Sequence, residues 1–438
     1  MALPIITWSL LSAQERRQAL RRPAQKDSAA LHEGVRAIIR EVRERGDSAL
    51  LEFTRRFDGV ALNAIEVSTA EFAAAETALS GEQRQAIDRA IANVRQFHEA
   101  QLGAPLRVET APGVVCERHF RPIDAVGLYV PAGVAPLPSA AIMVAVPARI
   151  AGCPTRIMCT PPRRDGTADP AVLTIANLCG VRRVFKLGGA QAIAAMAYGT
   201  QSVPKVDKIL GPGNSWVTAA KLLVANDPEG AALDLPAGPS EVLVIADATA
   251  RPEFVAADLL AQAEHSDDAQ VVFVTTSSAL AAATAAQIEK QIHSLGRADT
   301  VRKSIEHARL IIVDTIDTAL EVSNAYAPEH LILQVANARD WLPKVRNAGS
   351  VFLGTWTPET MGDYCSGTNH VLPTYGFARA YSGLSLHDFL KRMTVQELTS
   401  GGLRELGPTA ITLAALEGLD AHANAVRVRL AFLERERA

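Results

Sequence analysis

The chain has 438 residues, which is enough for two or three domains that each bury a core of their own. Its 44 basic and 47 acidic residues are well mixed and leave a net charge of -3, which excludes long-range attraction to nucleic acid or an anionic membrane. The longest apolar stretch, 140–146, is too short to span a membrane, and the first residues lack the features of a signal peptide. We therefore expect a cytoplasmic protein with small-molecule partners.

The first hundred residues carry helical patterns. Residues 1–24 form an arginine-rich pattern that ends at Arg22-Pro23 and is too short to fold alone, so we expect it to pack on another domain or subunit. Apolar residues recur at spacings of three and four in 32–45 and again in 82–101, which predicts two amphipathic helices. These two helices need an apolar surface to cover.

Two sets of alternating strands and helices follow, and such alternation is typical of parallel sheets covered by helices. The first set has predicted strands at 125–130, 156–159, 181–187 and 206–210, and helices near 138 and at 171–178, 190–197 and 215–225. The second set has predicted strands at 242–246, 270–275, 310–313, 331–335 and 350–353, with helices between them.

We therefore predict an α/β protein with two similar, helix-covered, mainly parallel-sheet domains of incomplete Rossmann-like build, plus small helical segments at the N- and C-terminal ends. The expected parts are an N-terminal helical segment at 1–24, a first α/β domain made of 25–128 with 239–380, a second α/β domain at 129–238, and a C-terminal tail at 381–438. This assignment places the early helices on the sheet of the second set.

A long irregular segment and a helical tail complete the chain. Residues 354–385 are rich in Gly, Thr, Pro and Tyr without a period, and irregular segments of that length in compact domains are usually functional. Helical patterns follow at 384–393, 403–416 and 421–433. We expect this tail to pack on its own subunit or on a partner.

Glu329 and His330 are the first candidates for chemistry. Pro328 fixes its own φ and biases Ala327 away from the helical region, so the pair is expected on a held loop before the apolar run 331–335, where both side chains can face one cleft. Free Glu titrates at about pH 4.3 and free His at about pH 6.5, so together they can move protons between a substrate and water. The alternative is an ordinary strand start with a solvated Glu and a packed His.

A second group of polar residues comes from distant segments and suits a metal ion. Gln262 and His265 are spaced i, i+3 on a predicted helix, so their side chains share a face. Asp363 lies in the irregular segment and His422 in the tail. Zinc or a similar ion, such as manganese or cobalt, takes histidine nitrogen together with carboxylate or amide oxygen. For His265, His370 or His422 taken singly, the alternative is a capping or surface role.

The residues alone do not predict a dinucleotide site. Gly211-Pro212-Gly213 has no third glycine at the distance of the usual fingerprint, and Gly188-Gly189 opens a helix without that pattern. Without further information, Tyr129 is expected to pack in the core and Gln191 to be an amide on a helix face.

Six strings that occur in order along nearly the whole chain resemble histidinol dehydrogenases. They are GLYVP at 127–131, KILGPGN at 208–214, DLPAGPSE at 234–241, LAQAEH at 260–265, APEHL at 327–331 and SGTNHVLPTYG at 366–376. Six long strings in the family's order are far more specific than any single motif.

The resemblance implies a four-electron alcohol dehydrogenase that contains one zinc ion per subunit and oxidises L-histidinol to L-histidine through L-histidinal, ending histidine biosynthesis. Two hydride transfers consume two NAD per histidinol, and the implied assembly is a homodimer with intertwined tails. By position, Glu329 and His330 match the catalytic pair, and Tyr129, Gln191 and Asn214 match the cofactor positions. The zinc ligands are matched by Gln262, His265, Asp363 and His422. The substrate positions are matched by Ser240, Gln262, His265, His330, Asp363, His370, Glu417 and His422.

The chain departs from the family pattern on the cofactor side. Ala132-Gly133 stands where Gly-Gly is expected after Pro131, and Ser215-Trp216 follows Asn214 where Ala-Tyr is common, which leaves the affinity for the cofactor open. Two alternatives to the implied function remain. One is a relative that oxidises another small alcohol, which the presence of His370 and Glu417 disfavours. The other is a zinc-stabilised binding protein without catalysis, which the retention of the catalytic pair disfavours.

Overall fold

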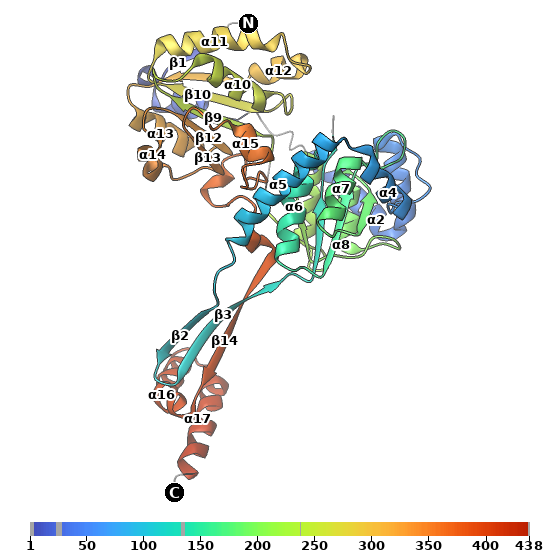
Figure 1. The fold of residues 1–438 in the computed structure, drawn as a ribbon. Coiled ribbons are helices and arrows are strands. Elements are labelled where there is room, and N and C mark those ends of the chain that lie inside the picture. Colours follow the sequence, from blue (N-terminus) through green and yellow to red (C-terminus); the bar gives the residue numbers. More distant parts are fainter. Residues whose placement is uncertain (1–3, 23–28, 133–135, 237, 437–438) are drawn as a thin grey trace. The chain divides into compact units, whose positions relative to one another are not determined.

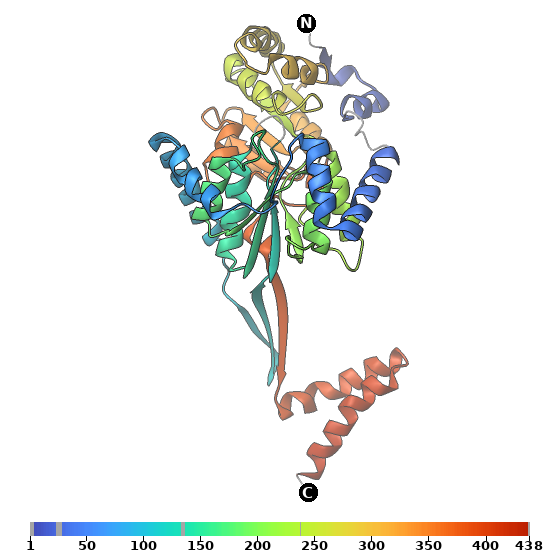
Figure 2. The same ribbon diagram turned by 90° about the vertical axis from the view of Figure 1, so that its right-hand side faces the viewer.

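The computed structural model describes residues 4–22, 29–132, 136–236 and 238–436. The chain forms two compact units (Figure 1, Figure 2). The first is made of Met1–Gln101 with Ile123–Phe389, and the second of Leu102–Pro122 with Leu390–Ala438. Among the described residues, no helix combines the length and the apolar content needed to cross a membrane. The expected fold class is confirmed, because two parallel, helix-covered sheets make up the first unit.

One of these sheets has five parallel strands in the order β6-β5-β4-β7-β8. Its central strands are apolar on both faces because helices cover both, as the continuous apolar run at 125–130 predicts. The strands are β4 (Ala125–Tyr129), β5 (Thr155–Thr160), β6 (Arg183–Lys186), β7 (Lys208–Leu210) and β8 (Ala232–Leu233). The helices between them are α6 (Pro138–Ile150), α7 (Pro170–Leu178), α8 (Gly189–Tyr198) and α9 (Ser215–Ala225).

The early helices pack on this five-stranded part, and the prediction that 25–128 belongs with 239–380 is wrong in this respect. The apolar stripe of α2, which includes Val35, Ile38 and Val42, shares a core with Ile193 of α8 and Val217 of α9. Helical periodicity identifies the apolar face of α2 but not the surface that this face meets. The early helices are α2 (Ala29–Arg45), α3 (Asp47–Phe53), α4 (Thr69–Ala78), which packs on α7, and α5 (Gly81–Glu99), which packs on α6 (Figure 1).

The other sheet has six parallel strands in the order β1-β11-β10-β9-β12-β13. Its strands are β1 (Ile5–Thr7), β9 (Glu241–Ala246), β10 (Gln270–Thr275), β11 (Arg309–Ile312), β12 (His330–Gln334) and β13 (Ser350–Leu353). One face packs against α10 (Pro252–Ala263), α11 (Ser278–Ile292) and α12 (Ala298–Ile305), and the other against α13 (Ile316–Tyr326) and α14 (Ala338–Trp341).

The N-terminal segment is not purely helical, contrary to the prediction for 1–24. Its first described residues form β1, which pairs with β11 at the edge of the six-stranded sheet, and α1 (Ala13–Ala19) follows. Trp8 is buried in the core on the α13 face of this sheet. A three-residue strand carries too little pattern to be recognised before its partner is known.

The second unit combines a three-stranded antiparallel sheet with a helical pair (Figure 1, Figure 2). Its strands are β2 (Leu106–Ala111), β3 (Val114–Pro122) and β14 (Leu390–Leu398), and its helices are α16 (Ser400–Leu416) and α17 (Asp420–Arg435), which pack on each other. The prediction of a helix at 384–393 is wrong, because a short 3-10 turn at Leu386–Phe389 leads directly into β14. The pairing of β14 with β3, distant in sequence, overrides the local pattern.

Candidate active site

Glu329 and His330 stand at the junction of a helix and a strand. Helix α13 runs through Tyr326, so the loop expected before the apolar run 331–335 is only a few residues long. Ala327 then adopts a left-handed conformation with φ of 55°, and its N–H donates to the carbonyl of Ser323 at 2.7 Å. This conformation agrees with the expectation that Pro328 keeps Ala327 out of the right-handed helical region. The sharp end turns the chain into β12, whose first residue is His330.

His330 is held on a central strand of the six-stranded sheet. It pairs with Val242 of β9 on one side and with Ser350 of β13 on the other, and its side chain is buried. Its Nδ1 atom lies 3.2 Å from the carbonyl oxygen of Glu241. A carbonyl only accepts, so this contact favours the tautomer with the proton on Nδ1, which leaves the lone pair of a neutral ring on Nε2. Nε2 lies 3.5 Å from Asp363 Oδ1, at the outer limit of hydrogen bonding.

Glu329 is also buried, and the backbone fixes its carboxylate. Its Oε2 atom accepts a hydrogen bond from the N–H of Glu241 at 2.9 Å and lies 3.7 Å from His330 Nδ1. Burial raises the pKa of Glu329 to about 8, against the opposing influence of His330 and of the Glu241 N–H. A carboxyl group with this pKa is poised to take up or release a proton near neutral pH.

A group of possible metal ligands lies next to His330. One ligand atom each from His265, Glu359 and Asp363 falls within 4.8 Å of the others. Histidine nitrogen with two carboxylate oxygens is a donor set that suits zinc and related divalent ions. The structure thus brings together two of the four predicted ligands, His265 and Asp363, and adds Glu359.

The third predicted ligand, Gln262, is buried beside this group. With its amide nitrogen turned toward the carboxylate, Gln262 donates to Glu359 Oε1 at 2.8 Å. Sequence reasoning missed Glu359 because the segment 354–385 was expected to be irregular throughout. In the structure, Glu359 and Asp363 open and close one turn of α15 (Glu359–Tyr364), and their i, i+4 spacing was a usable signal for a shared face.

Charge is concentrated in this buried group. Burial acts to lower the pKa of His330, but the carboxylates of Glu359, Glu329 and Asp363 outweigh it and raise the pKa well above its ordinary value. Burial raises the pKa of Glu359 to about 8. Burial also acts to raise the pKa of Asp363, but His330 and the neighbouring histidines lower it below its ordinary value. A divalent cation would offset this excess of carboxylates, so the residues present fit such an ion.

The predicted substrate residues of the first unit surround the same group. His370 Nδ1 lies 2.8 Å from the carbonyl oxygen of Asp363, and burial lowers the pKa of this imidazole. Ser240 and His265 line a cavity of about 320 Å³, whose other wall includes Asn214 at the start of α9. The cavity therefore joins the candidate metal group to one of the predicted cofactor residues.

The other two predicted cofactor residues lie deeper in the first unit. Tyr129 ends β4, is buried, and accepts a hydrogen bond from the N–H of Gly189 at 3.0 Å. Gln191 is buried in the first turn of α8, beside Gly189. Asn214 caps α9 by accepting from the N–H groups of Trp216 and Val217, each at 3.1 Å.

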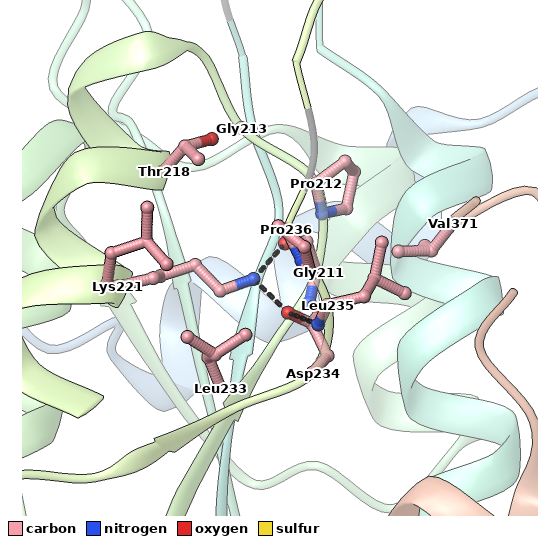
Figure 3. A pocket seen from close by; sticks show the side chains of 11 residues that line it. Gly211, Pro212, Gly213, Thr218, Lys221, Leu233, Asp234, Leu235, Pro236 and Val371 are labelled. Carbon is pink, nitrogen blue, oxygen red and sulfur yellow. Dashed lines mark hydrogen bonds and ion pairs between the residues drawn. The ribbon is translucent and has the colours of Figure 1, made fainter. Parts of the chain in front are cut away.

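A buried ion pair fixes the loop that precedes Asn214 (Figure 3). Lys221 of α9 pairs with Asp234, and its ammonium group also donates to the carbonyl of Gly211 at 2.9 Å. Asp234 accepts from the N–H of Gly211 at 2.8 Å. Gly211 has φ of 126°, and a Cβ there would lie 2.1 Å from the carbonyl oxygen of Tyr129. Only glycine fits this close approach of the two backbones, which sets the path of the chain from β7 to α9.

The remaining predicted residues belong to the second unit. Glu417 directly follows α16 and His422 lies in the first turn of α17, and both side chains are exposed in the single chain. On the cofactor side, the unusual Trp216 packs its ring against Gly34 of α2. Residue 133, part of the other departure from the family pattern, lies outside the described residues.

Comparisons with known proteins agree on one family. A family model described as histidinol dehydrogenase matches residues 20–430. A protein of Xanthomonas axonopodis pv. citri (strain 306) named histidinol dehydrogenase is 58% identical over 428 residues, covering 98% of this chain and 99% of that protein. One of Vibrio parahaemolyticus with the same name is 52% identical over 432 residues, covering 99% of each. The crystal structure of histidinol dehydrogenase from Elizabethkingia anophelis superposes with a TM-score of 0.95 at 45% identity and 99% coverage of both chains.

Proposed function

Because the chain belongs to the histidinol dehydrogenase family, we propose that it oxidises L-histidinol to L-histidine through L-histidinal in histidine biosynthesis, using NAD and a bound zinc ion. The observation that carries this proposal is the buried pair Glu329 and His330 beside the group His265, Glu359 and Asp363. Proton-transfer residues and metal donors converge at the amino ends of the central strands β9 and β12, the end opposite to the one where parallel α/β sheets usually bind ligands. Such a biosynthetic role fits the cytoplasmic location expected from the sequence.

We assign the metal and proton-transfer chemistry to the part built on the six-stranded sheet and the cofactor to the part built on the five-stranded sheet. His265 and Asp363 would hold the ion, with Gln262 next to them and His422 contributed by a tail. A zinc ion held there would orient the substrate through its imidazole and amine nitrogens, and NAD would supply the hydride acceptor. Tyr129, Gln191 and Asn214 are the proposed cofactor residues.

His330 is proposed to remove protons in both oxidations. Because Nδ1 faces the Glu241 carbonyl, Nε2 is the atom that accepts the proton from the alcohol as its hydride leaves. The carboxylates around His330 raise its pKa in the absence of a cation, and a cation among them would lower it toward the range in which neutral imidazole is available. In the second oxidation, the same atom takes the proton of the hydrated aldehyde.

Glu329 is proposed to activate the water that hydrates the aldehyde. Its raised pKa of about 8 makes its carboxylate a stronger base than an exposed one. The hydrogen bond from the Glu241 N–H keeps one oxygen in place and leaves the other to meet a water molecule. Buried surroundings also suit retention of a reactive aldehyde between the two steps.

We also propose a homodimer in which the second unit contacts a second copy of the chain. Its two helices and the turn between them carry exposed large apolar side chains, and large exposed apolar patches usually mark a contact with another protein. These side chains are Leu406, Leu413, Leu416, Leu419, Val428 and Phe432. Glu417 and His422 would then serve the site from a tail, which would account for their exposure in the single chain.

The test is the stoichiometry of NADH formation. With histidinol limiting and NAD in excess, the proposal predicts two NADH per histidinol, release of histidine, and loss of activity on chelation that zinc restores. One NADH per substrate, or turnover of other small alcohols at equal kcat/KM, would instead support the alternative of a relative with a different substrate. No NADH from a zinc-loaded protein would support the non-catalytic alternative.

A further inference from the structure

We propose that Arg22 is a positioning residue that holds Glu329 and His330 in their catalytic arrangement from the N-terminal segment. This inference rests on the proposed function, because it assigns a role relative to the proposed catalytic pair. Arg22 is the last described residue before the gap at 23–28, and it reaches a site whose other members lie more than two hundred positions later in the chain. The inference adds to the proposed mechanism the residue that fixes the positions of Glu329 and His330.

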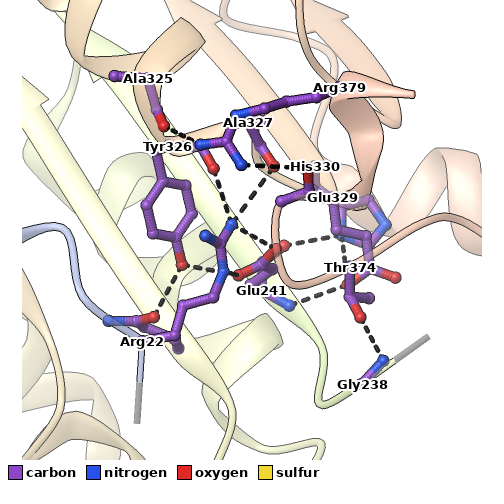
Figure 4. A network of polar contacts seen from close by, with 12 residues as sticks. Arg22, Gly238, Glu241, Ala325, Tyr326, Ala327, Glu329, His330, Thr374 and Arg379 are labelled. Atoms are coloured by element: carbon purple, nitrogen blue, oxygen red, sulfur yellow. Dashed lines mark hydrogen bonds and ion pairs between the residues drawn. The ribbon is translucent and has the colours of Figure 1, made fainter. Parts of the chain in front are cut away.

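The guanidinium group of Arg22 makes a two-pronged ion pair with Glu241 (Figure 4). Its Nε atom donates to Glu241 Oε2 at 2.6 Å, and its Nη2 atom donates to Glu241 Oε1 at 2.9 Å. The side chain of Arg22 is 13% exposed and that of Glu241 only 1% exposed. A fork-shaped pair with this burial has one geometry, unlike a surface ion pair that exchanges with water.

Glu241 passes this constraint to both members of the catalytic pair through its own backbone. Its N–H donates to Glu329 Oε2 at 2.9 Å, and its carbonyl oxygen lies 3.2 Å from His330 Nδ1. Because Glu241 is the first residue of β9, its side chain is the part that Arg22 can reach while its backbone faces the pair. A rotation of Glu241 would therefore displace the partners of Glu329 and His330 together.

Arg22 also holds the chain that leads into the pair. Its Nη2 atom donates to the carbonyl of Tyr326 at 2.9 Å and lies 3.3 Å from the carbonyl oxygen of Ala327. These are carbonyls that the end of a helix leaves without intrahelical partners. Ala327 sits in the left-handed region, where a residue with a side chain is strained. Contacts to both carbonyls stabilise this turn, which aims Glu329 and His330.

Tyr326 closes the arrangement and explains why arginine is needed. The guanidinium lies over the Tyr326 ring, 3.9 Å from its centroid, and the Tyr326 hydroxyl lies 2.8 Å from both Glu241 Oε2 and Gln270 Oε1. A planar guanidinium can stack on the ring, pair with the carboxylate and reach the carbonyls at once. A lysine ammonium keeps the charge but not this combination.

The experiment compares Arg22→Ala, Arg22→Lys and the control Arg21→Ala in the full-length, zinc-loaded protein. Arg21 is exposed, so its replacement reports the effect of losing one arginine from the segment. Steady-state kcat and KM are measured with histidinol and with histidinal. We expect Arg22→Ala to lower kcat about 10–100-fold for both substrates, with zinc content and the KM for NAD unchanged. Guanidinium ion added at millimolar concentration should restore part of the lost kcat in Arg22→Ala and none in Arg21→Ala.

Arg22→Lys gives the second test, which still applies if Arg22→Ala does not fold, because lysine keeps the positive charge. It should fold and still lower kcat at least about tenfold, because the fork and the carbonyl contacts are lost. A kcat within about threefold of the unmodified protein for Arg22→Lys, or for a folded Arg22→Ala, would overturn the proposal. So would equal losses in Arg21→Ala. Failure of the unmodified protein to form NADH would instead reject the proposed function.

Discussion

Glu359→Gln should separate the two effects of a buried carboxylate, because this change should stabilise the metal-free fold while weakening metal binding. Glu359 is 1% exposed, and its Oε1 atom lies 3.9 Å from His330 Nδ1. Glutamine keeps the shape and can still bond to the amide of Gln262, but it carries no charge. The charged carboxylate is stabilised by a neighbouring cation but destabilised when it is buried without one.

The magnitude follows from the pKa. A rise from 4.5 to about 8 corresponds to at most about 5 kcal/mol, and because neighbouring groups share this energy we expect about 1–3 kcal/mol for Glu359. The folded pKa is raised, so the unfolded state loses its proton first. The penalty therefore grows as pH rises from 4.5 and is complete above about 8. With the metal present, a 10–100-fold loss of affinity, roughly what supporting residues contribute, would offset much of this gain in stability.

The assay is thermal or urea unfolding at pH 6 and pH 9, which lie on either side of the Glu359 pKa of about 8. It is run with chelator and with zinc, alongside a titration of zinc affinity. Chelated Glu359→Gln should be more stable than the unmodified protein, and more so at the higher pH. With zinc bound, the stability of Glu359→Gln should exceed that of the unmodified protein by less than it does with chelator. The exposed Glu321 of α13 provides the matched control, because Glu321→Gln should change neither quantity. A Glu359→Gln protein that is less stable without metal at high pH and binds zinc as tightly would refute this reasoning.

Two further predictions concern the loop that precedes Asn214 and the C-terminal tail. Lys221→Met leaves the carboxylate of Asp234 buried without its partner, so it should lower the unfolding free energy by about 3–5 kcal/mol. It should also raise the KM for NAD more than the KM for histidinol. The double variant Lys221→Met with Asp234→Leu should recover most of the lost stability. Stability that is unchanged in the single variant would contradict the role of the pair. Truncation before Leu403 should abolish dimerisation and zinc binding together, as read by sedimentation and metal analysis, and a truncated monomer with full zinc content would exclude a site completed by the tail.

Periodicity predicted most elements of the two parallel sheets, because their strands are continuous apolar runs and their helices have clear apolar faces. It failed where distant partners decide the structure. The apolar stripe of α2 could have covered either sheet, and β14 becomes a strand through pairing with β3. Glu241 belongs to a resemblance string, yet its link to Arg22 depends on a contact across 219 positions that no local pattern encodes.

The candidate site shows the same limit. Glu329 and His330 were predicted from one short stretch, because Pro328 and the apolar run after it constrain the local chain. The proposed cofactor residues could be named only through the resemblance, since Tyr129 and Gln191 are buried and look like core residues. Glu359 stayed hidden because a single helical turn inside a long glycine-rich segment leaves too few residues for a period to appear.

The central claim is the division of labour between Glu329 and His330, and single-turnover NADH formation from histidinol and from histidinal tests it most directly. His330→Asn should slow both oxidations by about 10²–10⁴-fold, because it removes the base that both use. Glu329→Gln should slow the oxidation of histidinal far more than that of histidinol, because only the aldehyde needs an activated water. Zinc content is measured in each variant so that metal loss is not mistaken for lost chemistry. Equal slowing of both steps by Glu329→Gln would contradict the account and leave the pair as one proton-transfer unit.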